Sequence, residues 1–129
     1  MALKLTLKPN ERVILGGAVV RNGGNRVDLL IENEVPILRE SDILSPSAVR
    51  TPCERVVLAL QLVYVDPEHS SDHLATYRSL VSDVIAAAPS LGSLACTVEA
   101  EVAADRYYQA IKHARALLER ERELMSDVR

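Results

Sequence analysis

Residues 51–65 combine a helix-start signal with a nearly continuous apolar run, TPCERVVLALQLVYV. Thr51 and Glu54 have the spacing of a capping box, in which the two side chains satisfy each other's free backbone amides. Pro52 suits the first position of a helix. A helix over 52–65 would be apolar nearly all round, so we expect it to form the buried spine of the protein. A strand is the alternative, because the run is rich in valine.

The first forty residues show a different pattern, in which short apolar stretches alternate with turn residues. Residues 2–8 alternate leucine with lysine or threonine, which predicts a strand whose leucines (Leu3, Leu5 and Leu7) face a core. The same reasoning predicts four more strands, at residues 12–15, 18–21, 26–31 and 35–39. Pro9-Asn10 and Gly16-Gly17 supply the first two turns.

Residues 23–43 organise the second half of this β region. We expect Gly23-Gly24-Asn25 to form a tight hairpin, because these residues tolerate positive φ. Leu29-Leu30-Ile31 makes the next strand apolar on both faces, which predicts a central strand. Pro36 cannot donate a ladder hydrogen bond, so the strand that contains it should lie at an edge or join the sheet late. Ser41 and Asp42 can cap a short helical turn that ends before Pro46.

Further helices are predicted after Asp66-Pro67. Apolar residues at helical spacing predict a helix from about 70 to 88, with Ser70, Ser71 or Asp72 as its cap. Residues 90–98 suggest a less regular helix, and a long helix should run from about 99 to 124. Its inward stripe is predicted to be Ala103, Tyr107, Ala110, Ile111, Ala114, Leu117 and Leu118. Residues 119–129 lose this stripe, so we expect them to fray or to meet a partner.

Together these patterns predict an α+β protein. Residues 1–48 should form a small antiparallel β barrel or sandwich of about five strands. Residues 49–129 should form a helical half of three to four helices that packs on the β unit, giving one compact chain.

Composition limits the possible functions. The chain has 129 residues, is 48% hydrophobic and contains no Trp, no Phe and four Tyr, so its core must be aliphatic and aromatic platforms for stacking bases are scarce. The net charge of −3 argues against a nucleic-acid binder. However, residues 1–50 hold seven basic and six acidic side chains, and residues 51–129 hold eight and twelve. Basic surface is therefore expected in the N-terminal part, although a mixed solvated surface explains the asymmetry equally well.

The sequence also predicts a cytoplasmic protein that has no membrane partner. Charged residues such as Lys4 and Lys8 interrupt any apolar run at the start of the chain, so we expect no signal peptide. No window of about 18 residues is both uncharged and apolar, as a membrane-spanning helix would require. Cys53 and Cys96 lie far apart and form no CxxC motif, which is typical of reduced thiols.

No pattern in the chain indicates catalysis, so we expect a protein that is not an enzyme and needs no cofactor. His69 and His73 have a spacing that could bind a metal, but a third ligand is missing from any recognisable motif, so a surface pair near a helix start is the preferred interpretation. The two glycine pairs form neither GxGxxG nor a P-loop.

Four stretches of the chain resemble the FlbT family of flagellin-expression regulators: residues 3–21, 38–44, 51–66 and 104–121. A shorter resemblance, carried by residues 3–11, 24–27 and 35–40, is to the carbon storage regulators (CsrA-type RNA-binding proteins). That second resemblance implies a five-stranded β unit whose edge strands contact single-stranded RNA. The chain departs from the shorter family at Leu7-Lys8, where that family has two adjacent basic residues.

Arg39 is the leading candidate for RNA binding, because it matches the arginine that the carbon storage regulators use and would project from an edge strand. A surface arginine paired with Glu40 or Asp42 is the alternative. Lys4, Lys8 and Arg26 are further RNA-binding candidates. For protein partners the candidates are Tyr108 and its neighbour Arg106, against the alternative that the tyrosine packs on its own fold.

The FlbT resemblance implies a post-transcriptional regulator that binds the 5′ untranslated region of flagellin messenger RNA and represses translation or promotes decay. It also allows an alternative, a flagellin-export chaperone or assembly adaptor whose helical half binds flagellin or the small protein FlaF. The acidic helical half favours the adaptor, and Arg39 favours RNA. Short β units with free edges also make a homodimer possible.

Overall fold

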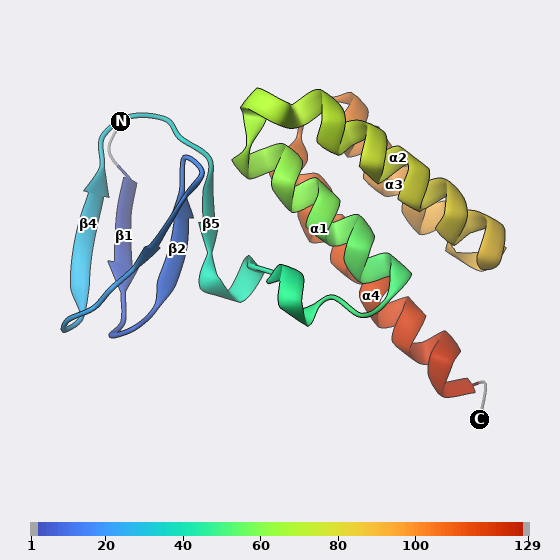
Figure 1. Cartoon of the computed structure of the whole chain (residues 1–129), viewed down its shortest axis with the longest axis horizontal. Helices are drawn as coiled ribbons and strands as arrows, with labels where there is room; N and C mark the ends of the chain where they lie inside the picture. The colour runs from blue at the N-terminus through green and yellow to red at the C-terminus, as the bar shows by residue number, and fades with distance from the viewer. Residues whose placement is uncertain (1–2, 128–129) are drawn as a thin grey trace. The chain divides into compact units, whose positions relative to one another are not determined.

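The computed structural model describes residues 3–127, which divide into two compact units (Figure 1). The first unit, here called the β unit, extends to Ile43, and the second, the helical unit, begins at Leu44. Among the described residues all five strands lie in the β unit and all four α-helices lie in the helical unit, which confirms the predicted α+β class.

The β unit consists of two antiparallel sheets. Its strands are β1 (Leu3–Leu7), β2 (Arg12–Leu15), β3 (Ala18–Arg21), β4 (Val27–Ile31) and β5 (Ile37–Arg39). β1 pairs with β4, and the other sheet has the order β3-β2-β5. The unit is therefore sandwich-like rather than a closed barrel, and its small core is formed by Leu5, Leu7 and Val13. As predicted, β5, which follows Pro36, is an edge strand.

The turn at Gly16-Gly17 is a two-residue hairpin between β2 and β3. Both glycines have positive φ, 56° and 92°, which most side chains would oppose. This local prediction is confirmed, and it fixes the register of the hairpin so that Ile14 lies opposite Val19.

The predicted hairpin at Gly23-Gly24-Asn25 is wrong, because β3 and β4 belong to different sheets. Neither glycine has positive φ, and the segment is a crossover loop. Asn22 holds this loop in place: its Nδ2 donates to the carbonyl oxygens of Leu7 (3.2 Å), Lys8 (3.1 Å) and Asn25 (2.9 Å). The asparagine thereby ties the loop to the end of β1.

The prediction that β4 is a central strand is also wrong. β4 pairs only with β1, so it is an edge strand of a two-stranded sheet. Leu29 is half-buried and packs on the β core, whereas the side chain of Leu30 is 67% exposed. In β1, Leu5 and Leu7 are buried as predicted, but Leu3 near the chain start is 47% exposed.

The connection to the helical unit contains two short 3-10 turns, Glu40–Asp42 and Pro46–Ala48. Helix α1 then spans Pro52–Val65, with the bounds that its sequence predicts. The amide of Glu54 donates to Thr51 Oγ1 (3.2 Å) and the amide of Thr51 donates to Glu54 Oε1 (2.9 Å), so the capping box is formed. Eight of the fourteen residues of α1 are buried, which makes it the spine of this unit.

The remaining helices are α2 (Ser70–Ala87), α3 (Gly92–Ala103) and α4 (Tyr107–Asp127). α1 packs against α2 and α4, and α3 packs against α4 (Figure 1). Five residues of the predicted stripe on α4, from Ala110 to Leu118, are buried in this core, and Tyr107 is half-buried. Ala103 is exposed, and Val102 takes its place in the core.

The boundary between the last two helices differs from the prediction, because α3 continues past Glu99 and the chain breaks at residues 104–106. Asp105 has φ of 59°, the amide of Arg106 donates to the carbonyl of Glu101, and the amide of Asp105 donates to that of Val102. These bonds form a Schellman motif, which usually places glycine where Asp105 stands. Because aspartate tolerates this conformation, no glycine marked the break in the sequence.

The C-terminal segment is helical up to Asp127 and does not fray within the described residues; residues 128–129 of the predicted frayed segment lie outside them. Leu124 packs on the core, and Glu121 Oε2 accepts a hydrogen bond from the amide of Cys53 at 3.1 Å. Between residues 3 and 127 no helix has the length and apolarity to cross a bilayer.

Candidate functional site

Three of the four predicted RNA-binding residues lie along one sheet of the β unit. Lys4 is in β1, and its side chain is 65% exposed. Lys8 and Arg26 are exposed and lie directly beyond the last residue pair of the sheet, Leu7 with Val27. The structure thus places Lys4 on the β1–β4 sheet and Lys8 and Arg26 just beyond its end.

One carboxylate lies among these basic residues. Asp28 is opposite Thr6 in the register, accepts a hydrogen bond from the Thr6 hydroxyl at 2.7 Å and pairs with Lys4 Nζ at 3.5 Å. The hydrogen bond from Thr6 and then the charge of Lys4 lower the pKa of Asp28. Asp28 is therefore ionised at neutral pH and offsets part of the positive charge of Lys4.

Arg39 lies in the other sheet, at the end of β5, and is exposed. Its neighbour Glu40 pairs with Arg12 instead: Glu40 Oε1 accepts from the backbone amide and from Nε of Arg12, both at 3.3 Å. Within residues 3–127 the side chain of Arg39 has no hydrogen bond or ion pair. This guanidinium is therefore available to an external phosphate or base edge.

The two predicted partner-binding residues of the helical unit already make contacts within it. Arg106 Nε lies 2.6 Å from Glu101 Oε2, and this hydrogen bond is the main cause of the lowered pKa of Glu101. The Tyr108 ring is half-buried, 5.9 Å from the ring of Tyr64, with Lys112 Nζ 5.2 Å from its centroid. Both residues thus contribute to the fold, and their binding role stays a prediction.

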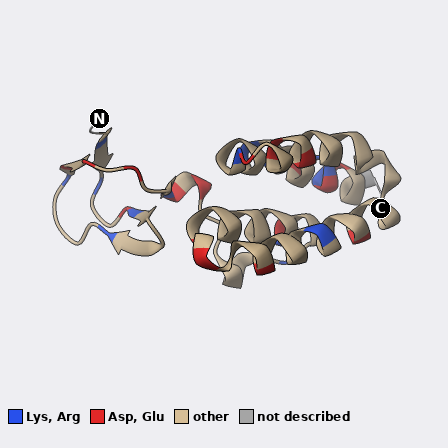
Figure 2. Cartoon of the chain, turned by 90° about the horizontal axis from the view of Figure 1, so that it is seen from above, with Lys and Arg blue, Asp and Glu red and all other residues tan. Residues whose placement is uncertain are grey.

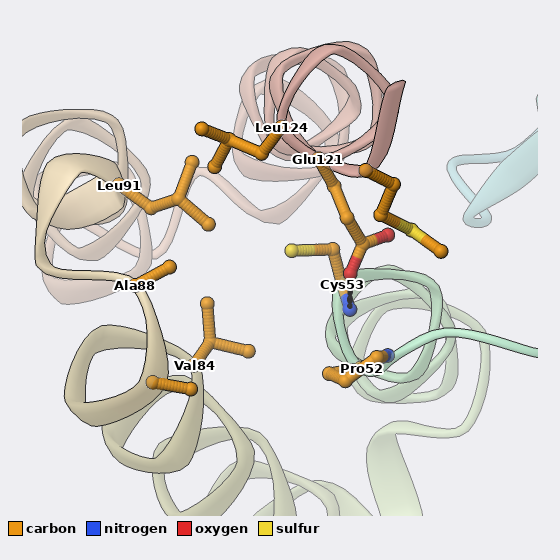
Figure 3. A pocket seen from close by; sticks show the side chains of 9 residues that line it. Pro52, Cys53, Val84, Ala88, Leu91, Glu121 and Leu124 are labelled. Atoms are coloured by element: carbon orange, nitrogen blue, oxygen red, sulfur yellow. Dashed lines mark hydrogen bonds between the residues drawn. The ribbon is translucent and has the colours of Figure 1, made fainter. Parts of the chain in front are cut away.

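A hollow with a nearly continuous apolar wall opens among α1, α2 and α4 (Figure 3). Its volume is about 200 Å³, and it is lined by Pro52, Cys53, Val84, Ala87, Ala88, Leu91, Glu121, Leu124 and Met125. Figure 3 shows the Cys53 thiol pointing into this hollow, toward Leu91 and Val84. Burial and then the charge of Glu121 raise the pKa of Cys53 to about 12, so the thiol is protonated and a poor nucleophile.

The two histidines that raised the question of a metal bind a carboxylate instead. His69 Nδ1 and His73 Nε2 lie 3.1 Å and 3.0 Å from Asp66 Oδ2. Hydrogen bonds from His73 and then His69 lower the pKa of Asp66. In the described part of the chain no group of three or more His, Cys, Asp or Glu residues has the arrangement of a metal site.

Acidic and basic residues are interspersed along the helices of the helical unit (Figure 2). Sequence reasoning missed three residues that the structure makes prominent, Leu30, Asn33 and Glu121. The sequence did contain a signal for an exposed Leu30, because strand alternation places it on the same face as the charged residues Arg26 and Asp28. Glu121 had none, because its contact spans 68 residues.

These features describe an α+β protein whose β unit exposes Arg39, unpaired among the described residues, and whose helical unit has an apolar hollow. The model of the family described as flagellar protein FlbT matches residues 3–125. The chain belongs to the FlbT family.

Curated relatives bear names that refer to flagellum biosynthesis. The probable flagellum biosynthesis repressor protein FlbT 1 of Bradyrhizobium diazoefficiens is 43% identical over 125 residues, covering 96% of this chain and 85% of that protein. The flagellum biosynthesis repressor protein FlbT of Caulobacter vibrioides is 32% identical over 130 residues, covering 99% of this chain and 92% of that protein. A probable repressor of the same name in Rhodopseudomonas palustris is 32% identical over 126 residues, covering 98% of this chain and 99% of that protein. No solved structure matches the chain significantly.

Proposed function

We propose that this protein is a cytoplasmic regulator of flagellum biosynthesis that binds the 5′ untranslated region of flagellin messenger RNA. Its relatives are named as repressors, which supports repression of translation or promotion of decay as the outcome. Binding would occlude an unpaired segment of the leader, because sequence-specific RNA recognition mostly targets single strands. No catalytic step is part of this proposal.

The observation that carries the RNA proposal is the exposed Arg39 guanidinium, which has no intramolecular partner among residues 3–127. If Arg39 served only to stabilise the fold, it would be expected to pair with its neighbour Glu40, yet Glu40 pairs with Arg12. Arg39 can therefore donate several hydrogen bonds to a phosphate or base edge. Lys4, Lys8 and Arg26 add phosphate contacts from the other sheet, consistent with the resemblance to carbon storage regulators.

Fluorescence anisotropy with a labelled flagellin leader tests this proposal over a series of salt concentrations. Arg39→Ala should weaken binding roughly tenfold, because a hydrogen bond to a charged group is lost. It should also reduce the slope of log K against log salt by about 0.7, the value for one phosphate of a single strand. Arg55→Ala, which removes an exposed arginine from α1, is the control with the same charge change. A well-folded wild type that binds no leader at low salt would refute the proposal.

The apolar hollow of the helical unit favours a second candidate function, an export chaperone or assembly adaptor for flagellin or FlaF. Met125 lines the hollow and is 58% exposed, so Met125→Glu should place a charge there without unfolding the unit. Titration of purified flagellin or FlaF should then show lost binding for Met125→Glu and retained binding for Met125→Leu. Equal affinities would exclude the hollow.

Homodimer formation is part of the same proposal, because each sheet of the β unit ends in edge strands, which can pair with a strand of another chain. Light scattering coupled to size exclusion measures the mass of the particle in solution. A dimer supports pairing, and a monomer at all concentrations rejects it.

A further inference from the structure

The outward face of the β1–β4 sheet has an apolar residue near the end of β4. Residues directly opposite each other in an antiparallel pair share a face, so Lys4 lies beside Leu30 and Thr6 lies beside Asp28. Leu30 is 67% exposed in this otherwise polar surface. An exposed leucine next to a lysine offers an external ligand both an apolar contact and a positive charge.

A hollow of about 310 Å³ adjoins this leucine. It is lined by Leu15, Leu30, Ile31, Glu32, Asn33 and Val35. Its wall mixes apolar side chains with polar groups, unlike the wall of the hollow in the helical unit. Asn33 is exposed, and its side-chain amide makes no hydrogen bond within residues 3–127. This amide offers two donors and one acceptor to a ligand.

The chemistry of the hollow suits a nucleobase better than a phosphate. The faces of an unstacked base are apolar and its edges are polar, and the wall of this hollow likewise combines apolar and polar groups. Glu32 would repel a phosphate but can accept a hydrogen bond from the exocyclic amino group of adenine, cytosine or guanine. The base would have to pack on an aliphatic side chain, because the chain has no Phe or Trp and its four Tyr lie at residues 64, 77, 107 and 108, outside the β unit.

We propose that Leu30 and Asn33 form a subsite for one unpaired nucleobase of a single-stranded RNA. The base packs on Leu30 in the hollow, its edge hydrogen-bonds to Asn33 and Glu32, and Lys4, Lys8 and Arg26 contact the flanking phosphates. This inference rests on the proposed RNA-binding function and adds to it a site for a base with an amino group, in preference to uracil.

Single abasic substitutions along a labelled leader oligoribonucleotide locate such a base. In the wild type, one abasic position should weaken binding markedly, by roughly tenfold if the base buries the leucine side chain. Leu30→Ala should weaken binding of the intact oligonucleotide by a similar factor with an unchanged salt slope, because no phosphate contact is lost. The abasic position should then cost Leu30→Ala less than it costs the wild type, since the packing contact is already lost and only the hydrogen bonds to Asn33 and Glu32 remain to be removed.

Val19→Ala is the matched control, because Val19 is 65% exposed on β3, in the other sheet. It should bind like the wild type. Glu32→Gln should reduce the preference for adenine, cytosine or guanine over uracil at the sensitive position, because the carboxylate is the acceptor proposed for the exocyclic amino group. Circular dichroism verifies that each variant is folded.

The possible outcomes separate this inference from the proposed function. If RNA still binds but Leu30→Ala behaves like Val19→Ala, or if the abasic cost is the same in wild type and Leu30→Ala, the subsite is refuted and RNA binding stands. If the wild type binds no RNA, both proposals fail.

Discussion

Replacing Glu121 with alanine tests a contact that holds the end of α4 to the start of α1. Glu121 Oε2 accepts a hydrogen bond from the amide of Cys53 at 3.1 Å, as Figure 3 shows. This amide is one of those at the start of α1 that have no carbonyl partner within the helix. The carboxylate also lies at the positive end of the helix dipole.

The expected cost follows from these two effects. A hydrogen bond to a charged group contributes about 1.5–3 kcal/mol, and water can replace part of it at this half-buried site, so we expect a loss of about 1–2 kcal/mol. With an m value of about 2 kcal/mol per molar urea, the midpoint should fall by roughly 0.5–1 M. Glu121→Gln, which keeps an acceptor but loses the charge, should cost about half as much.

Urea unfolding followed by circular dichroism at 222 nm measures this loss in the helices. Glu119→Ala is the control, since Glu119 is exposed on the same helix and its replacement changes the net charge equally; its effect should stay within about 0.5 kcal/mol. If both alanine variants shift the midpoint equally, the hydrogen bond contributes nothing to the stability of the helical unit and the reasoning is refuted.

Three further predictions concern buried or paired groups. Tyr77→Phe should leave the free energy of unfolding unchanged or raise it by up to about 1 kcal/mol, because the Tyr77 hydroxyl is buried with no hydrogen-bond partner in the described chain. Urea titration measures this free energy. A clear loss of stability would contradict the prediction and show that the hydroxyl has a hydrogen-bond partner. Iodoacetamide at pH 8 should label the exposed Cys96 and spare the buried Cys53, whose pKa is raised to about 12; mass spectrometry of the native protein counts the labels, and rapid double labelling would contradict the burial of Cys53. The pKa of Asp66 is lowered, chiefly through the hydrogen bond from His73, so the contribution of Asp66 to stability is present above its unfolded pKa and is lost as pH falls below about 4. Urea midpoints measured from pH 3 to 6 should therefore fall more steeply with decreasing pH for the wild type than for Asp66→Asn. Parallel curves would contradict this prediction.

Local signals predicted the elements that depend on neighbouring residues. The capping box of Thr51 and Glu54 determines where α1 begins, and both partners lie within four residues. The Gly16-Gly17 hairpin is equally local, since the positive φ values of its two glycines set the register of β2 and β3. In each case the energetic preference is present in a short peptide, so the sequence can be read directly.

Predictions failed where the pairing partner is distant in the chain. Gly23-Gly24-Asn25 has the composition of a hairpin turn, but a crossover loop has the same composition, and only the pairing of β4 with β1 distinguishes the two. The same pairing turned Leu30 outward and made β4 an edge strand. The break between α3 and α4 was missed because Asp105 adopts the conformation that glycine usually takes.

The candidate site divides in the same way. The sequence by itself identified Arg39, Lys4, Lys8 and Arg26 as basic residues of a β unit, because charge and strand alternation are properties of the chain alone. Only the tertiary structure decided that Glu40 pairs with Arg12 and leaves Arg39 without a partner among the described residues, and that Leu30 adjoins a hollow with Asn33. Arg12 and Glu40 lie 28 positions apart, and the hollow also includes Leu15 of β2, so this geometry depends on the packing of whole strands rather than on any local preference.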